Sequence, residues 1–415
     1  MSLYSLKMAG IGAVQPWSQA VTLAEAGKGC DGLFGLYDSL GDKTLVGANT
    51  VATLLDGPEK VVRYGALTMG DGTTPTSLTA ANRCKGLVIL CDSLTVKANA
   101  TLHMTGRGAR VLTNDDPFFP FIDYRIPFKI SLDSSRMTLA QALAVIKSQG
   151  LAPWDVGTFQ HVVAGMFGFN LGVSLAGSAT FILASGCGLG AAYRYSANVS
   201  TGAPGFAGAN GGMGGGGGGG SNAISGDCYF GRAGTGCPYS GGSGGGGTCH
   251  ESVSNNVKVM PTPYSGPGGK GGREFQMVNQ GGYAMDNTTQ SPHYGGGGAG
   301  NPGGLAGSSV NQFPGENGCG GKLTIICRGT VTVQSGGKIE ANGMKGGSSQ
   351  NYGGGGGSGG GHISIISPNA VSNAGTIQSA GGIGGANGGP DSASVKGGDG
   401  GAGSVVTKTF SDMGW

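Results

Sequence analysis

Short apolar stretches that alternate with polar residues recur along the chain at a similar spacing. Residues 87–106 read LVILCDSLTVKANATLHMTG, and residues 323–343 read LTIICRGTVTVQSGGKIEANG. Each copy predicts a short strand, a turn, a second alternating strand, a glycine-containing turn and a third strand that ends in glycine. With Thr330 treated as one inserted residue, the aligned pairs are Leu87 with Leu323, Ile89 with Ile325, Leu90 with Ile326, Cys91 with Cys327, Leu94 with Val331, Val96 with Val333, Leu102 with Ile339 and Gly106 with Gly343.

A third copy, HISIISPNAVSNAGTIQSAGG, begins at His362, and the half-repeat GVSLAGSATFILASG at residues 172–186 resembles the second part of the unit. Three short strands with turns about every 6 to 8 residues cannot bury a face alone, so they are expected to stack on their neighbours. We therefore predict the rungs of a β-solenoid, with a β-sandwich of similar strands as the alternative. The third copy places at the repeat positions Ile363, Ile365, Ile366, Val371, Ile377 and Gly381.

One segment breaks this pattern. Residues 134–150, SSRMTLAQALAVIKSQG, place apolar side chains at helical spacing and end in Gly150, which predicts a helix. The three prolines of the preceding stretch, residues 117–128, exclude both helix and central strand. We interpret residues 109–160 as an inserted helical and aromatic subdomain, or as a helix that plugs the end of the solenoid.

Glycine changes this picture most, because it supplies 92 of the 415 residues, roughly a fifth against roughly 7% in ordinary chains. The uninterrupted runs include GGMGGGGGGG at 211–220, GGSGGGG at 241–247, GGGG at 295–298 and GGGGGSGGG at 353–361. Such runs are flexible linkers or extended helices of the polyglycine II type that hydrogen-bond sideways. Their exclusion of bulky residues favours a packed bundle.

The predicted fold is mostly β, a β-solenoid-like stack of short strands with a polyglycine II helix bundle and one small helical insertion. We divide the chain into an N-terminal attachment region (1–60), a first solenoid cassette (61–108), the inserted subdomain (109–160), further β strands (161–200), a glycine-rich bundle with projecting loops and the second cassette (201–361), and a C-terminal cassette (362–415).

Charge and hydropathy limit the partners. The 25 Lys and Arg residues nearly balance the 22 Asp and Glu residues, and no basic cluster predicts a nucleic-acid partner. Residues 1–30 are interrupted by Lys7 and Pro16, so we expect no signal peptide and synthesis in the cytoplasm. The uncharged stretch from Val156 to Tyr193 contains many polar and small residues, which favours a buried sheet or an assembly interface over a membrane span.

Enzyme motifs are not found in the sequence. Glycan hydrolysis needs two carboxylates at a fixed separation across a sugar, and the acidic residues of the second half stand apart. The chain also has no nucleophile elbow, no zinc-protease motif and no phosphate-binding loop. We predict a non-enzymatic protein with no catalytic residues, no metal and no cofactor. The isolated acidic residues are Asp227, Glu251, Glu274, Asp286, Glu316 and Glu340.

The nine cysteines are an odd number, which suggests that the thiols are mostly reduced when the chain folds. Cys228, Cys237 and Cys249, with His250, lack the short spacing that preorganises zinc sites. We keep two interpretations for these three cysteines. Either two of them form a disulfide, or all three remain thiols. Cys91 and Cys327 occupy equivalent repeat positions and are expected to be buried at corners of the solenoid.

The strand cassettes ANRCKGLVILCDSLTVKANATLHMTGRGA and GGKLTIICRGTVTVQSGGKIEANGMKGG, with GGGGGSGGGHISIIS, resemble glycine-rich fibre and tail proteins of bacteriophages. The glycine runs are similar to the distal adhesins of T-even-like long tail fibres, in which glycine helices form a sandwich that presents receptor-binding loops. The resemblance covers roughly residues 62–108 and 205–410, and the long N-terminal half departs from the short adhesins. It implies a virion protein that is made in the host cytoplasm, joins other virion proteins as a homo-oligomer, preferably a trimer, and contacts a host receptor that is a glycan or an outer-membrane protein.

Aromatic residues in the loops between glycine runs are the candidate receptor contacts. Rigid amphipathic rings flanked by Gly, Ser and Asn give contact area at low entropic cost. The alternative is that the rings shield the glycine bundle. The head, collar or decoration fibre and the polysaccharide-degrading tail spike are the competing functions. The candidate residues are Tyr229, Phe230, Tyr239, Tyr264, Phe275, Tyr283, Tyr294, Phe313 and Tyr352.

Overall fold

The computed structural model describes fifteen stretches of the chain, and for 195–199 and 226–229 it describes the backbone alone. The predicted helix at 134–150 and the half-repeat at 172–186 lie outside these stretches. Within the described residues, no helix is long and apolar enough to span a bilayer. The stretches are 34–35, 37–110, 188, 190–191, 195–199, 204–221, 226–229, 233–234, 236–237, 239–247, 268, 295–306, 312–350, 353–386 and 396–413.

Three parallel five-stranded sheets surround one apolar core. The first sheet consists of β3 (Lys60–Arg63), β6 (Leu87–Cys91), β11 (Lys322–Cys327), β14 (His362–Ser367) and β17 (Ser404–Thr409). The second sheet consists of β1 (Lys43–Leu45), β4 (Ala66–Met69), β7 (Ser93–Val96), β12 (Val331–Val333) and β15 (Ser372–Asn373). The third sheet consists of β2 (Ala48–Val51), β5 (Thr76–Ala80), β8 (Ala100–His103), β13 (Lys338–Glu340) and β16 (Thr376–Gln378).

Each of the four central rungs gives one strand to every sheet, so the predicted solenoid-like stacking is confirmed. The register follows the sequence repeat, because Leu323 pairs with Leu87, Val331 with Leu94 and Ile339 with Leu102. The third copy joins in the same register, for example Ile377 beside Ile339. Two further rungs, β1–β2 and β3–β4–β5, precede the copies that the sequence pattern identified. In the first sheet, β6 is apolar along its whole length because it is buried on both faces. Leu87, Ile89 and Cys91 point into the central core, whereas Val88 and Leu90 lie in a second cluster on the outer face. A strand buried on both faces reads as a continuous apolar run and not as an alternation.

The outer cluster is centred on Phe34, whose ring lies 4.6 Å from the Arg328 guanidinium carbon and 5.5 Å from that of Arg63. The short helix α8 (Phe410–Met413) adds Phe410 to this cluster.

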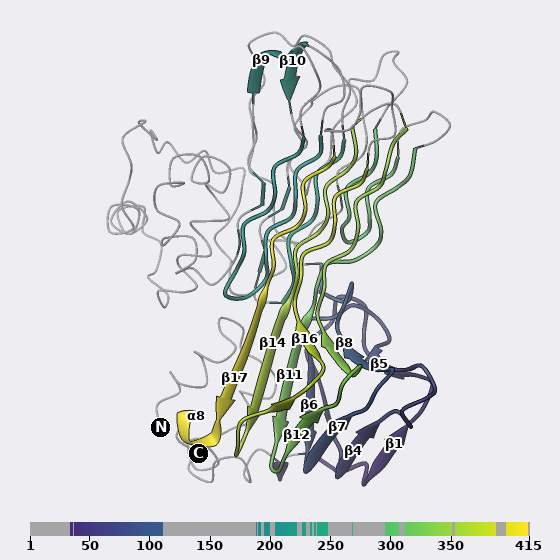
Figure 1. Ribbon diagram of the computed structural model, residues 1–415, viewed down its shortest axis with the longest axis vertical. Coiled ribbons are helices and arrows are strands. Elements are labelled where there is room, and N and C mark those ends of the chain that lie inside the picture. Colours follow the sequence, from purple (N-terminus) through teal and green to yellow (C-terminus); the bar gives the residue numbers. More distant parts are fainter. Residues whose placement is uncertain are drawn as a thin grey trace.

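The glycine-rich segments are long extensions of one corner of the solenoid. Three times the chain leaves after a strand of the third sheet, β8, β13 or β16, and returns at the start of a strand of the first sheet, β11, β14 or β17. We call the described parts of residues 188–403 that lie in these extensions, outside the solenoid strands, the glycine layer. Figure 1 shows its segments running side by side from the solenoid toward the end that carries β9 (Tyr195–Val199) and β10 (Gly226–Tyr229), which pair in antiparallel fashion.

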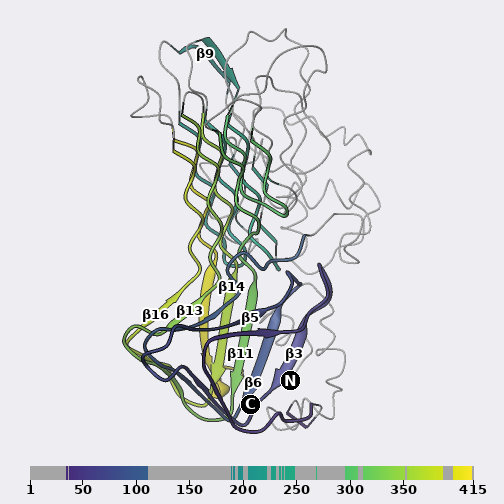
Figure 2. The same cartoon turned by 90° about the vertical axis from the view of Figure 1, so that its right-hand side faces the viewer.

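The glycine layer is held by backbone hydrogen bonds that change direction at every residue. The consecutive amides of Gly216, Gly217 and Gly218 donate to the carbonyls of three different segments, at Ala209, Gly234 and Gly357. Three residues further along the chain, Gly219 bonds again to the first of these segments and Ser221 to the third. The lateral bonding therefore repeats with a period of three residues, and the segments are stacked more than one deep (Figure 2).

Candidate functional site

The interior of the glycine layer leaves no room for a side chain at its glycine positions. A Cβ built on Gly218 would lie far inside 3.0 Å of the Gly398 carbonyl oxygen, and one on Gly356 would meet the Gly218 carbonyl in the same way. Real Cβ atoms essentially never approach so closely. The few serines inside the layer satisfy their hydroxyls locally, as Ser358 does with the Gly318 carbonyl at 2.9 Å. Side-chain chemistry is therefore largely kept out of the interior of the layer.

At the root of the layer, a buried ion pair crosses the rungs. Lys322 Nζ lies 2.8 Å from Glu59 Oε1, and the two side chains are 1% and 0% exposed. Gly86 lies between them in the stack, and a Cβ there would be 2.8 Å from the Glu59 carboxylate. The absent side chain at Gly86 is what lets Glu59 reach Lys322 over the intervening rung.

The polar ladder continues in the same direction through His362, the register partner of Lys322. His362 Nδ1 lies 2.6 Å from Ser404 Oγ, and that hydroxyl lies 2.6 Å from the Gly212 carbonyl oxygen. Because a carbonyl only accepts, the Ser404 hydroxyl donates its hydrogen to the Gly212 oxygen. Nδ1 of His362 must therefore carry a hydrogen and donate a hydrogen bond to Ser404 Oγ. Burial, followed by the neighbouring Lys322 charge, lowers the pKa of His362 to about 3, so its ring is neutral at ordinary pH.

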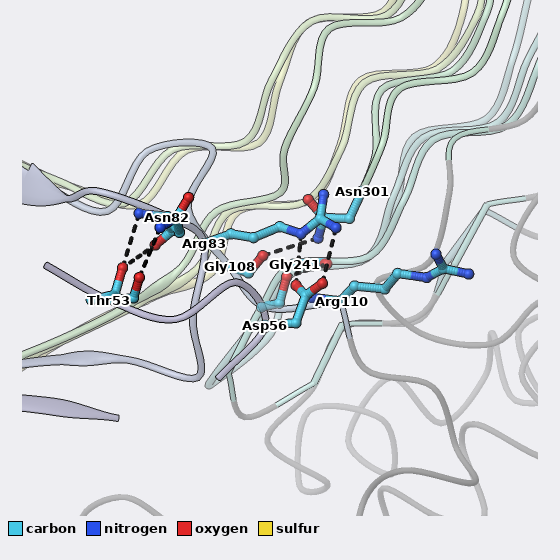
Figure 3. A network of polar contacts seen from close by, with 9 residues as sticks. Thr53, Asp56, Asn82, Arg83, Gly108, Arg110, Gly241 and Asn301 are labelled. Carbon is cyan, nitrogen blue, oxygen red and sulfur yellow. Dashed lines mark hydrogen bonds and ion pairs between the residues drawn. The ribbon is translucent and has the colours of Figure 1, made fainter. Parts of the chain in front are cut away.

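A second polar cluster lies at the same root on the corner of the earlier rungs (Figure 3). Asp56 receives two hydrogen bonds from the Arg83 guanidinium, at 2.6 and 2.9 Å, and one from the Arg110 amide at 2.7 Å. Thr53 and Asn82 exchange side-chain and backbone hydrogen bonds beside it.

Asn301 connects this cluster to the glycine layer, because its Nδ2 donates to the Gly108 carbonyl at 3.0 Å. Figure 3 shows this contact and the Arg83–Asp56 pair in one view. The root is thus a set of buried or half-buried polar contacts that fix where the glycine segments leave the rungs.

The structure places the predicted receptor contacts that it describes in different environments, some exposed and some buried. Phe313 is 54% exposed, and its amide donates to the Ser348 carbonyl. Tyr239 is only 2% exposed and lies under Lys85 Nζ, 5.5 Å from its ring centroid, so it is a packing residue and not an exposed loop aromatic. Its ring packs in a buried cluster with Ala109 and Cys237. Tyr229 is placed in β10 by its backbone, and Phe230, Tyr264, Phe275, Tyr283, Tyr294 and Tyr352 lie outside the described residues.

The described cysteines are buried thiols. Cys237 lies close enough to Cys319 to influence it, and burial together with Cys237 raises the pKa of Cys319 to about 12. Of the other two members of the candidate disulfide, Cys228 is described by its backbone alone and Cys249 lies outside the described residues. In the part of the chain that the structure describes, no group of three or more His, Cys, Asp or Glu residues is arranged to hold a metal ion.

Sequence reasoning missed the polar ladder at the root. Lys322 and His362 are the first residues of β11 and β14, so their shared repeat position was a usable signal, but Glu59 belongs to a rung with a weaker pattern. The described residues form a scaffold with a tightly bonded root at the solenoid and an opposite end that carries β9 and β10. No family model, curated protein or solved structure matches the chain.

Proposed function

We propose that this chain is a non-enzymatic bacteriophage virion fibre protein, in which the glycine layer is a stalk of polyglycine II helices. The three-residue period of the lateral hydrogen bonds supports the helix assignment, because polyglycine II has three residues per turn and no internal hydrogen bonds. Each turn then presents its N–H groups to three neighbours in succession. A bundle of this kind resists bending because every segment is bonded on several sides.

The observation that carries the proposal is the common origin of the three glycine extensions. All three arise at one corner of the solenoid, and their described segments run side by side toward the end that carries β9 and β10 (Figure 1). The sequence predicts recognition loops between the glycine runs. Loops on a rigid scaffold are the usual place for recognition. We propose that these loops contact a host surface receptor, a glycan or an outer-membrane protein, and that the solenoid end attaches to other virion proteins as a homotrimer.

The second candidate is a head, collar or decoration fibre whose glycine layer is only a durable surface. The burial of Tyr239 favours it, because that ring shields the layer and is not available to a partner.

Adsorption of assembled particles tests the proposal. Phe313, Tyr264 and Tyr294 are changed together to Ala, and Leu40→Ala serves as the matched control, since Leu40 on the solenoid is 53% exposed and Phe313 is 54% exposed. We expect the triple variant to lose adsorption to the native host and the control to keep it, with normal particles in both. Normal adsorption by well-formed triple-variant particles would favour the decoration fibre. The mass of the purified chain by light scattering tests the trimer.

A further inference from the structure

Two thiols are stacked on each other in the two neighbouring rungs that flank the longest glycine extension. Cys91 closes β6 and Cys327 closes β11, and their Cα atoms are register partners in parallel strands. Both side chains are 0% exposed and belong to the central core. The next positions along the stack, Ser367 and Thr409, carry hydroxyl groups, so the thiols are confined to this one pair of rungs.

The geometry of the pair suits a covalent bond. Neighbouring strands lie about 4.8 Å apart, and disulfides join Cα atoms about 4.4 to 6.8 Å apart. The Cys91 thiol already hydrogen-bonds to the Cys327 sulfur, which lowers the pKa of the Cys327 thiol. Both cysteines end their strands, and the chain turns at Asp92 and Arg328.

We propose that Cys91 and Cys327 are an oxidation site at which a peroxide-class oxidant forms a disulfide between the third and fourth rungs. The Cys327 thiolate attacks hydrogen peroxide, the O–O bond breaks, and a sulfenic acid forms with release of hydroxide. The Cys91 sulfur then attacks the Cys327 sulfur, the S–O bond breaks and water leaves. In sum, two thiols and one peroxide give one disulfide and two waters. The product closes residues 92–326 into a covalent loop that contains the whole first glycine extension, and the inference does not depend on the proposed function.

Cys84 supplies an internal control. It is buried like the pair, but its neighbours along the stack are Gly57 and Gly108, which offer no sulfur. Burial raises the pKa of Cys84 to about 11, so it contains little thiolate. We expect it to remain a thiol under conditions that link Cys91 to Cys327.

The experiment treats the reduced, folded, full chain with increasing hydrogen peroxide, quenches with catalase, and alkylates the remaining thiols in guanidinium before trypsin digestion. The expected product is GLVILCDSLTVK joined to LTIICR, with the loss of two hydrogens, while the Cys84 peptide is alkylated. On a non-reducing gel the linked chain should migrate faster, because its closed loop is more compact, and dithiothreitol should reverse the shift.

Cys91→Ser should abolish both the linked peptide and the mobility shift, and Cys327 should then accumulate as sulfinic acid. Three results overturn the inference. They are linkage of either cysteine to a different one, oxidation of Cys84 to the same extent, and full alkylation of Cys91 and Cys327 at the highest peroxide concentration that leaves the circular dichroism spectrum unchanged. Each result is read from the wild-type chain, so the inference stays testable if the variant fails to fold.

Discussion

Replacing Gly356 by Ala separates a packed glycine layer from a flexible linker, because the two structures predict effects of opposite sign. The backbone of Gly356 is outside the left-handed region, so an alanine can adopt its conformation. In a linker, or at a site with space, this change would stabilise the folded state by about 0.4 to 1 kcal/mol by restricting the unfolded chain. In the layer, the new methyl group points at the Gly218 carbonyl.

The magnitude follows from the surrounding bonds. To bring the methyl group to the 3.0 Å that real Cβ atoms keep, the two segments must separate by on the order of 1 Å. The amide of Gly218 donates to Gly357 at 2.8 Å, and this bond does not survive such a shift. One broken bond between buried groups leaves a donor and an acceptor unsatisfied, so we expect a loss of about 2 to 4 kcal/mol.

The assay is guanidinium unfolding followed by circular dichroism, combined with hydrogen exchange at the amides around residues 215–221. Gly47→Ala is the matched control, because nothing lies within 4 Å of its Cβ position and its φ of +76° costs an alanine conformational energy alone. We expect a loss of about 1 to 2 kcal/mol for the control, with no change of exchange in residues 215–221. Equal or greater stability for Gly356→Ala, with unchanged exchange, would refute the packed layer.

Four further outcomes are expected. Residues 204–221 should survive limited proteolysis, since their amides are bonded to neighbouring segments, and rapid cutting there would contradict the lateral bonding. Lys322→Met should lower the free energy of unfolding by about 3 to 5 kcal/mol because it leaves Glu59 charged and buried, whereas the double change with Glu59→Met should restore most of it in chemical denaturation. His362 is neutral in the folded chain and protonates near pH 6.5 when unfolded, so its contribution to stability should be lost as the pH falls from 6.5 toward about 3, and His362→Gln should flatten this dependence in unfolding curves measured across that range. Tyr239→Ala should cost about 3 to 5 kcal/mol of stability by leaving a cavity, as thermal or chemical unfolding would reveal.

The rungs at Leu87–His103 and Lys322–Glu340 were determined by the sequence, down to the register of individual residues. The reason is that an apolar side chain stacks on its own equivalent in the next rung, so the core requirement repeats with the chain. The first rung lies in residues 1–60, which we predicted as an attachment region, because its strands β1 and β2 are largely exposed and need few apolar residues. An apolar sequence pattern does not reveal strands that are held mainly by backbone hydrogen bonds to a single neighbouring rung.

The paths of the glycine segments were decided only by the tertiary structure. Glycine has no side chain to mark a neighbour, so the runs predict close approach but not which backbone approaches which. Their partners are selected by the solenoid, which releases each extension from the same corner and brings Glu59, Lys322 and His362 together from three rungs. The same close approach converted Tyr239 from a predicted surface ring into a buried one. Composition thus determined that a packed glycine layer was possible, and the long-range stacking of the rungs decided its geometry, because backbone hydrogen bonds carry no sequence information of their own.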